Sequence, residues 1–218
     1  MADVLDSTIE SLLQAGNARP EPPLDAMEAY GRDRDFPIVG PDVGRFLRVV
    51  ATMIGAERVF EFGSGFGYSA AWIAGALPET GDMYLTDYDE KNLARAREFL
   101  AEAGYDGMAT YRNGDALQSF DETSGQFDFV LIDHEKSRYA DAFDHAVDRI
   151  ADDGVVVADN TMAGPVEPAA VASALKGADP VDDATDGIAT YIETVREHPS
   201  FESVLVPLGE GLLVSVRR

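Results

Sequence analysis

Cysteine is absent from this 218-residue chain, and only three of its residues are lysines. Without cysteine the protein has no disulfide framework, no thiolate metal site and no thiol nucleophile. No apolar run approaches the roughly 20 residues that a membrane-spanning helix needs. The N-terminus has early acidic residues and neither a basic segment nor a long apolar one. We therefore expect no signal peptide and a cytoplasmic location.

Positive charge is scarce as well. Forty acidic residues oppose 17 lysines and arginines, which gives a formal net charge of −23. A charge of this sign repels nucleic acids and anionic membranes, so we expect neither as a partner. The acidic residues are spread over the whole chain, as is typical of halophilic proteins, where concentrated salt screens the self-repulsion. An ordinary acidic protein is the alternative interpretation.

Apolar patterning predicts a single domain, residues 1–218, of the α/β class. Helix-like spacing marks an N-terminal helical segment over 1–54. Over 55–218, short apolar strands alternate with amphipathic helices, which predicts a doubly wound, mostly parallel, Rossmann-like sheet. The predicted parallel strands cover 58–62, 82–87, 108–113, 127–133 and 154–160, and a helix is predicted over 137–150.

The C-terminal part follows a different pattern. Residues 201–218 are predicted to form two strands joined by a short turn with proline and glycine, an antiparallel hairpin at the edge of the sheet. Residues 161–187 are rich in alanine, proline, glycine and aspartate. We expect them to form either a mobile loop with a short helix or a lid.

A glycine-rich turn follows the first predicted strand. Its pattern is E-x-G-x-G-x-G, with Glu61 followed by Gly63, Gly65 and Gly67. Glycine lets the backbone approach a ligand closely, and the following helix supplies free N–H groups. A dinucleotide fingerprint, G-x-G-x-x-G, would need glycine at position 68, where the chain has Tyr68. The turn therefore indicates a nucleotide site but disfavours a nicotinamide oxidoreductase.

Two further strand ends carry acidic residues. Asp87 ends the second strand, 24 residues after Gly63, where a carboxylate can accept hydrogen bonds from both ribose hydroxyls. Asp89 is better placed to cap the next helix. Asp115, in the N-G-D-A stretch after the third strand, is expected near an adenine. Together these residues predict an adenosine-containing ligand.

Oxygen-bearing side chains follow the fourth and fifth strands. Asp133 ends the fourth strand, and Asp159 and Asn160 follow the fifth. Neighbouring parallel strands lie about 4.8 Å apart, so these side chains can point at one ion. An all-oxygen set suits Mg²⁺ or Ca²⁺ better than zinc. Each residue alone would be interpreted as a helix cap or a turn residue, but their occurrence on adjacent strands favours a metal site.

Lys136 stands three residues after Asp133, in a chain with almost no lysine. A general base for a metal-bound hydroxyl needs a lowered pKa and a position close to the metal. A nearby cation and partial burial each disfavour the ammonium form. Lys136 is therefore the candidate base.

Three stretches of the chain resemble known methyltransferase motifs. The stretch EFGSGFGYS, residues 61–69, resembles the S-adenosylmethionine (SAM) motif of class I methyltransferases, and its ending points to the catechol and caffeoyl-CoA O-methyltransferase families. The stretch DHEKSRY, residues 133–139, resembles the D-H-x-K-x-R-Y stretch of catechol O-methyltransferases, and ADN, residues 158–160, resembles their metal pair. The resemblance covers 36–218 and includes the C-terminal hairpin.

The resemblance implies roles for individual residues. Asp133, Asp159 and Asn160 would bind Mg²⁺, and Lys136 would deprotonate the substrate. Val39 would hold the methionine part of SAM. Ser69, Asp87 and His134 would lie at its carboxylate end, its ribose and its adenine. The predicted cofactor-binding residues are Val39, Glu61, Gly63, Gly65, Gly67, Ser69, Asp87, Asp115, Asp133 and His134.

We therefore predict a SAM-dependent and divalent-metal-dependent O-methyltransferase. Its substrate would be a hydroxylated aromatic small molecule with a vicinal diol, methylated by in-line displacement. Glu135 stands where catechol enzymes have a tryptophan, so a small catechol itself is not specified. A metal-independent methyltransferase of the same fold and a non-catalytic SAM-binding protein are the alternatives. By analogy with caffeoyl-CoA-type relatives, the N-terminal helices are a candidate homodimer interface.

Overall fold

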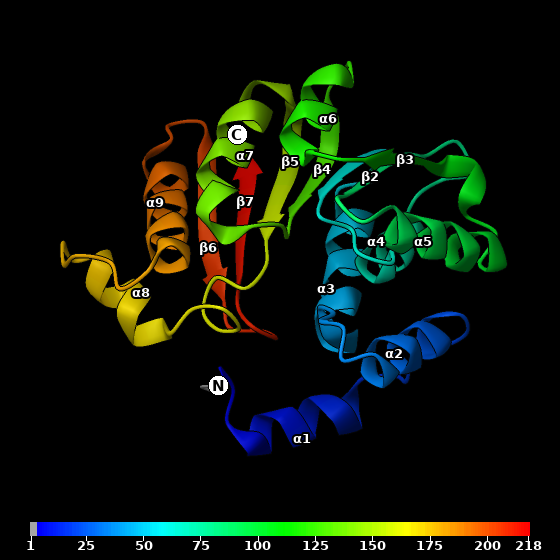
Figure 1. Cartoon of the computed structure of the whole chain (residues 1–218), viewed down its shortest axis with the longest axis horizontal. Coiled ribbons are helices and arrows are strands. Elements are labelled where there is room, and N and C mark those ends of the chain that lie inside the picture. The colour runs from blue at the N-terminus through cyan, green and yellow to red at the C-terminus, as the bar shows by residue number, and fades with distance from the viewer. Residues whose placement is uncertain (1–3) are drawn as a thin grey trace.

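A seven-stranded sheet forms the centre of the protein (Figure 1). The structure is a computed structural model, and it describes residues 4–218. The strand order is β3-β2-β1-β4-β5-β7-β6. The strands are β1 (Arg58–Phe62), β2 (Asp82–Asp87), β3 (Ala109–Asn113), β4 (Phe127–Ile132), β5 (Ile150–Ala158), β6 (Phe201–Val206) and β7 (Leu212–Arg217). The first five are parallel, and β7 pairs antiparallel with both β5 and β6.

Helices cover both faces of this sheet (Figure 1). They are α1 (Ser7–Gly16), α2 (Leu24–Asp33), α3 (Gly40–Met53), α4 (Tyr68–Ala74), α5 (Glu90–Glu102), α6 (Ala116–Glu122), α7 (Tyr139–Ala146), α8 (Pro168–Ala174) and α9 (Asp183–Glu197). Helices α2 to α5 share a core with one face, and α6 to α9 share a core with the other. Within β1, Val59 belongs to the first core and Phe60 to the second, as the alternation along a strand requires.

The predicted doubly wound sheet with an antiparallel C-terminal hairpin is therefore confirmed. The strands predicted at 58–62 and 82–87 match β1 and β2 residue for residue. The crossovers from β1 to β2 and from β3 to β4 place the new strands on opposite sides of β1. The ends of β1 and β4 thus border the point where the strand order reverses, which is where ligands of such sheets bind.

Other boundaries differ from the predictions. The helix predicted over 137–150 is shorter, because α7 ends at Ala146 and a 3₁₀ turn leads into β5 at Ile150. The start of β5 was missed because residues 151–153 are half-exposed or exposed and include Asp153 at a φ of +63°. Residues 161–187, expected as a mobile loop with a short helix or as a lid, hold the short helix α8 and the start of α9.

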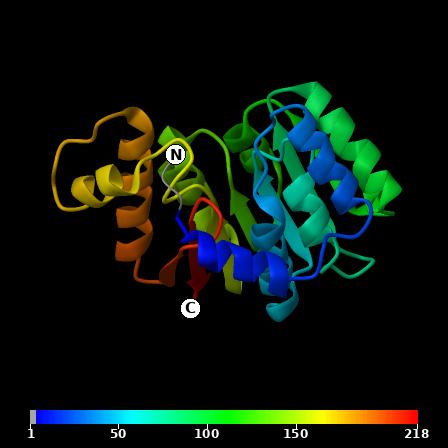
Figure 2. The ribbon, with the colours of Figure 1, turned by 90° about the horizontal axis from the view of Figure 1, so that it is seen from below.

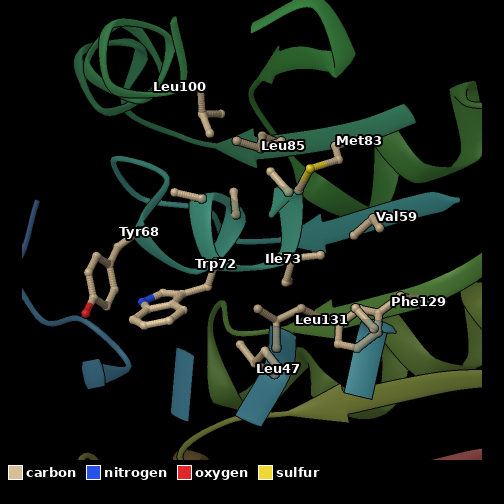
Figure 3. Close-up of a cluster of buried hydrophobic side chains, with 14 of the residues drawn as sticks. Leu47, Val59, Tyr68, Trp72, Ile73, Met83, Leu85, Leu100, Phe129 and Leu131 are labelled. Atoms are coloured by element: carbon tan, nitrogen blue, oxygen red, sulfur yellow. The ribbon is translucent and has the colours of Figure 1, made fainter. Parts of the chain in front are cut away.

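Helix α4, which follows the glycine turn, is buried at every residue. Its Trp72 packs against α3, where a Cβ atom at Gly44 would lie 2.3 Å from the indole ring. Only glycine at that position permits the two helices to come so close. Figure 3 shows Trp72 between Tyr68 and Leu47 in this core. The turn before α4 is thus fixed against a rigid support.

Helix α1 lies on the outside of the domain (Figures 1 and 2). Within its described length it has no buried residue, and Leu12 is 65% exposed. Across residues 4–218, no helix has both the length and the apolar character to cross a membrane.

Candidate active site

A cavity of about 780 Å³ opens at the carboxyl ends of the parallel strands. Its wall combines the glycine turn, the ends of β2 and β4, the residues after β5 and the loop before α3. Most of the predicted site residues lie on this wall, namely Val39, Gly63, Gly65, Ser69, Asp87, Asp133, His134, Lys136, Asp159 and Asn160. Glu61, Gly67 and Asp115 were predicted to bind the cofactor but are not part of the lining.

The glycine turn brings the end of β1 against the end of β4. Gly63 adopts a φ of +84°, and a Cβ atom there would lie 2.5 Å from the carbonyl oxygen of Asp133. A larger residue would therefore separate the two strand ends. The amide of Gly63 donates to Thr86 Oγ1 at 3.1 Å, and the amide of Gly65 donates to Asp87 Oδ2 at 3.0 Å. Both hydrogen bonds tie the turn to the end of β2.

Glu61 supports the site from behind the wall. Its side chain is fully buried and accepts a hydrogen bond from the hydroxyl of Ser69, which does line the cavity. Burial raises the pKa of Glu61 to about 7, although the Ser69 hydrogen bond acts in the opposite direction. Glu61 therefore orients Ser69 and does not itself face the cavity.

Asp87 presents its carboxylate to the cavity and is held by three donors. Besides Gly65, these are the Asp89 amide at 2.7 Å and the Asn92 side chain at 3.1 Å. Asp89 itself accepts from the Lys91 amide and caps α5, as predicted. The Asp87 carboxylate is therefore fixed at the end of β2, in a position suited to ligand hydroxyls.

Asp115 has structural partners on both oxygens. Its Oδ1 accepts from the Leu117 amide at 2.8 Å and caps α6, a helix that the sequence did not predict. Its Oδ2 accepts from Arg138 at 2.8 Å, and this hydrogen bond lowers the pKa of Asp115 to about 2. The adjacent residues Gly114 and Ala116 do line the cavity. The backbone around Asp115, not its carboxylate, forms this part of the wall.

His134 has two ring nitrogens that are buried without a partner among residues 4–218. Its ring stacks on Tyr139, with the centroids 5.5 Å apart and 15° between the planes. Burial lowers the pKa of His134 to about 4, with help from the charges of Lys136 and Arg138. The imidazole is therefore neutral at pH 7, with one donor and one acceptor available to a ligand.

The predicted metal ligands meet around Lys136. Its Nζ lies 2.9 Å from Asp133 Oδ1 and 2.6 Å from Asn160 Oδ1. Asp159 is only 2% exposed, and burial raises the pKa of its carboxyl well above the usual range. Asn160 adopts a φ of +55°, a conformation that asparagine tolerates better than most residues. The ends of β4 and β5 are thus close enough for their side chains to share one cation.

Glu210, in the turn between β6 and β7, was not singled out in the sequence. Its carboxylate accepts from the Asn160 side chain and lies on the cavity wall. Its backbone carbonyl accepts the amides of Met162 and Ala163, which ties the turn to the segment after β5. The only local feature of the sequence that pointed to Glu210 was its place as an acidic residue between two glycines in a hairpin turn. The contact with Asn160 spans 50 residues of sequence, so local pattern could not reveal it.

The donor set of this cluster fits a hard divalent cation. Asp133 and Asp159 supply carboxylate oxygens and Asn160 supplies an amide oxygen, the ligand types that Mg²⁺ prefers. No group of three histidine, cysteine, aspartate or glutamate side chains in the described part of the chain forms a metal-binding cluster by itself. The amide of Asn160 is therefore needed to complete a three-ligand set.

Comparison with known proteins decides the family. The family model described as O-methyltransferase matches residues 30–218. The chain belongs to this O-methyltransferase family. A catechol O-methyltransferase from Niastella koreensis is 30% identical over 200 residues, which cover 85% of this chain and 86% of that protein. A caffeoyl-CoA O-methyltransferase from Medicago sativa is 27% identical, over 81% of this chain and 73% of that protein.

Solved structures of O-methyltransferases share the fold. An O-methyltransferase from Bacillus cereus, solved in complex with SAH, superposes with a TM-score of 0.83 and 22% identity. The match covers 97% of this chain and 97% of that one. The resemblance inferred from the sequence motifs and the Rossmann-like methyltransferase fold are thereby confirmed.

Proposed function

We propose that this O-methyltransferase transfers the methyl group of SAM to a hydroxyl of a vicinal aromatic diol, with a divalent cation. One observation carries the proposal. A single cavity joins the glycine turn and Asp87 to the cluster of Asp133, Asp159, Asn160 and Lys136. The glycine turn and Asp87 suit an adenosine-containing donor. The four-residue cluster suits a cation and an acidic hydroxyl. The names of the catechol and caffeoyl-CoA O-methyltransferase relatives support an aromatic acceptor.

The cofactor half of the cavity holds SAM in this proposal. Val39 and Ser69 face the methionine part, Asp87 accepts from the ribose hydroxyls, and the neutral ring of His134 lies near the adenine. Two features fit such a ligand: the nitrogens of His134, which have no partner among residues 4–218, and the place of Gly63 and Gly65 on the cavity wall. The SAH bound to the Bacillus cereus enzyme supports SAM as the donor.

The other half of the cavity holds the cation and the acceptor. Asp133, Asp159 and Asn160 would bind the cation, which when present lowers the pKa of an acceptor hydroxyl and aligns it. Lys136 takes the hydroxyl proton. The oxygen then attacks the methyl carbon, a C–O bond forms, and the C–S bond breaks with its electrons left on sulfur. Because the methyl group of a sulfonium is already activated, the chain contributes mainly by alignment and exclusion of water.

The test is transfer of labelled methyl from SAM to a panel of vicinal aromatic diols in molar KCl. We expect transfer with Mg²⁺ and none with EDTA. The variant Asp159→Ala should lose about 100-fold or more in turnover, while SAM affinity stays within a factor of three. Asp144→Ala, at an exposed residue of α7, is the matched control and should behave like the wild type. Transfer that survives EDTA would favour the metal-independent alternative.

A homodimer through the N-terminal helices also forms part of the proposal. Ile9 and Leu12 of α1 are 45% and 65% exposed. Apolar side chains on an outer helix gain stability when a second copy covers them. Light scattering on the purified protein measures the mass in solution and decides between monomer and dimer.

A further inference from the structure

Lys136 is held by three oxygens at once. Its Nζ donates to Asp133 Oδ1 at 2.9 Å, to Asn160 Oδ1 at 2.6 Å and to the Tyr139 hydroxyl at 2.5 Å. Tyr139 in turn donates to the carbonyl of Asp159 at 3.1 Å, so its oxygen is an acceptor toward the lysine. An ammonium group has three N–H donors and no acceptor. All of the hydrogen-bonding capacity of Lys136 is therefore used within the cluster.

Two of these three oxygens belong to the proposed cation ligands. A cation bound by Asp133 and Asn160 would lie about 2.0–2.6 Å from their oxygens, depending on its size. The ammonium nitrogen lies 2.9 and 2.6 Å from the same two atoms, so it occupies the space between them that the cation would need. Two positive charges so close together repel strongly, because the surroundings are largely shielded from water. The ammonium and the cation therefore cannot share this position.

Lys136 also bears on the balance of charge in the cavity. Five acidic residues lie on its wall, and three of them, Asp133, Asp159 and Glu210, belong to the cluster around Lys136 and Asn160. Lys136 is the only lysine or arginine on that wall within residues 4–218, and its side chain is only 11% exposed. Asp159 is buried and the other two are half-buried, so without a cation their negative charge is costly. The ammonium of Lys136 thus offsets their charge when no metal is bound.

We propose that Lys136 is the resident cation of the metal-free protein and that a divalent ion displaces it. The inference rests on the proposed metal-dependent function. Displacement frees the lysine from Asp133, Asn160 and Tyr139, so that it can face the acceptor hydroxyl. The displaced ammonium gives one proton to the solvent, and the neutral amine that remains has the lone pair that accepts the hydroxyl proton. Arrival of the cation and release of the base are then one event.

The test compares Mn²⁺ binding to the wild type and to Lys136→Met, measured by electron paramagnetic resonance without substrate. Methionine has a similar length and no charge. We expect Lys136→Met to bind Mn²⁺ about tenfold more tightly or better, because the competing charge is gone. In EDTA the variant should melt at a lower temperature than the wild type. The rise in melting temperature on adding Mn²⁺ should be larger in the variant.

Lys91→Met, at an exposed residue of α5, is the matched control and should leave Mn²⁺ affinity unchanged. If Lys136→Met fails to fold in EDTA, Lys136→Gln keeps N–H donors without the charge and takes its place. Equal or weaker Mn²⁺ binding by the Lys136 variants would overturn the inference while the metal site itself stands. Absence of Mn²⁺ binding from the wild type and all variants, with EDTA-resistant turnover, would overturn the proposed metal requirement as well.

Discussion

At the scale of single residues, Glu61 makes the stability of the protein depend on pH. Its carboxyl is fully buried behind Ser69, and burial raises its pKa from 4.5 to about 7. The folded protein therefore holds the Glu61 proton up to about pH 7, whereas the unfolded chain releases it near pH 4.5. The contribution of this proton to the free energy of unfolding is fully present below pH 4.5 and is lost as pH rises through 7. It amounts to about 3 kcal/mol.

The variant Glu61→Gln should remove this loss, because a glutamine amide does not titrate and still accepts from Ser69. We expect its free energy of unfolding, relative to the wild type, to rise by about 3 kcal/mol between pH 4.5 and 8. Chemical denaturation at fixed salt measures both proteins. Glu102→Gln, at an exposed residue, should show the wild-type dependence. Parallel curves for the wild type and Glu61→Gln would contradict the burial argument.

At the scale of elements, α9 presses on the 3₁₀ turn that carries Lys136. A Cβ atom at Gly187 would lie 2.3 Å from the Lys136 carbonyl oxygen and 2.5 Å from Ser137 Cα. Both are backbone atoms, so no change of rotamer can relieve the contact. Alanine favours a helix over glycine by about 1 kcal/mol, but overpacking against backbone costs about 1–3 kcal/mol. We expect the steric cost to exceed the gain in helix propensity.

Gly187→Ala should therefore destabilise the protein by up to about 2 kcal/mol and lower methyl transfer about tenfold or more. SAM affinity should stay within a factor of three, because α9 does not line the cavity. Calorimetric binding of SAM and turnover measured side by side separate the two effects. Gly107→Ala, where a Cβ atom meets nothing within 4 Å, is the control. A normal turnover number in Gly187→Ala would show that the turn can shift without harm.

Sequence reasoning located most of the strand ends but not the contacts between distant segments. The strands β1, β2 and β4 are mostly apolar, and Gly63, Asp87 and Asp133 stand at their ends, so pattern placed these residues together. Helix α6 was missed because its seven residues are too few for a clear period. Its cap, Asp115, was interpreted as a ligand residue for the same reason.

The interior of the cluster depends on geometry that no local pattern encodes. The stretch DHEKSRY placed Lys136 near Asp133, but not its hydrogen bonds to Tyr139 and Asn160. Glu210 reaches Asn160 only because β7 pairs with β5 and brings its turn beside the end of that strand. Such pairings bring together residues some 50 positions apart, and they follow from the packing of the whole sheet.

At the scale of the whole molecule, the net charge of −23 should make stability depend on salt. Electrostatic self-repulsion acts over about 10 Å at 0.1 M salt and about 3 Å at 1 M. The ion pairs found in residues 4–218 are mostly between partly or well exposed side chains and contribute little to stability. Screening the repulsion is therefore expected to outweigh weakening these pairs.

We expect the melting temperature to rise by about 5 °C or more between 0.1 and 2 M KCl, which corresponds to roughly 2 kcal/mol. Differential scanning calorimetry measures this shift. Glycerol at equal osmolality, which does not screen charge, should give a smaller rise. A melting temperature that is unchanged up to 2 M KCl would favour an ordinary acidic protein over a halophilic one.

The single tryptophan gives this molecule a built-in optical probe. Trp72 is 1% exposed, so its fluorescence should be emitted at short wavelength and move to longer wavelength when water reaches the indole. Its ring meets Tyr68 edge to face, with centroids 6.4 Å apart, and Tyr68 lines the cavity. The same emission band can therefore follow both unfolding of the core and occupation of the cavity, without any label.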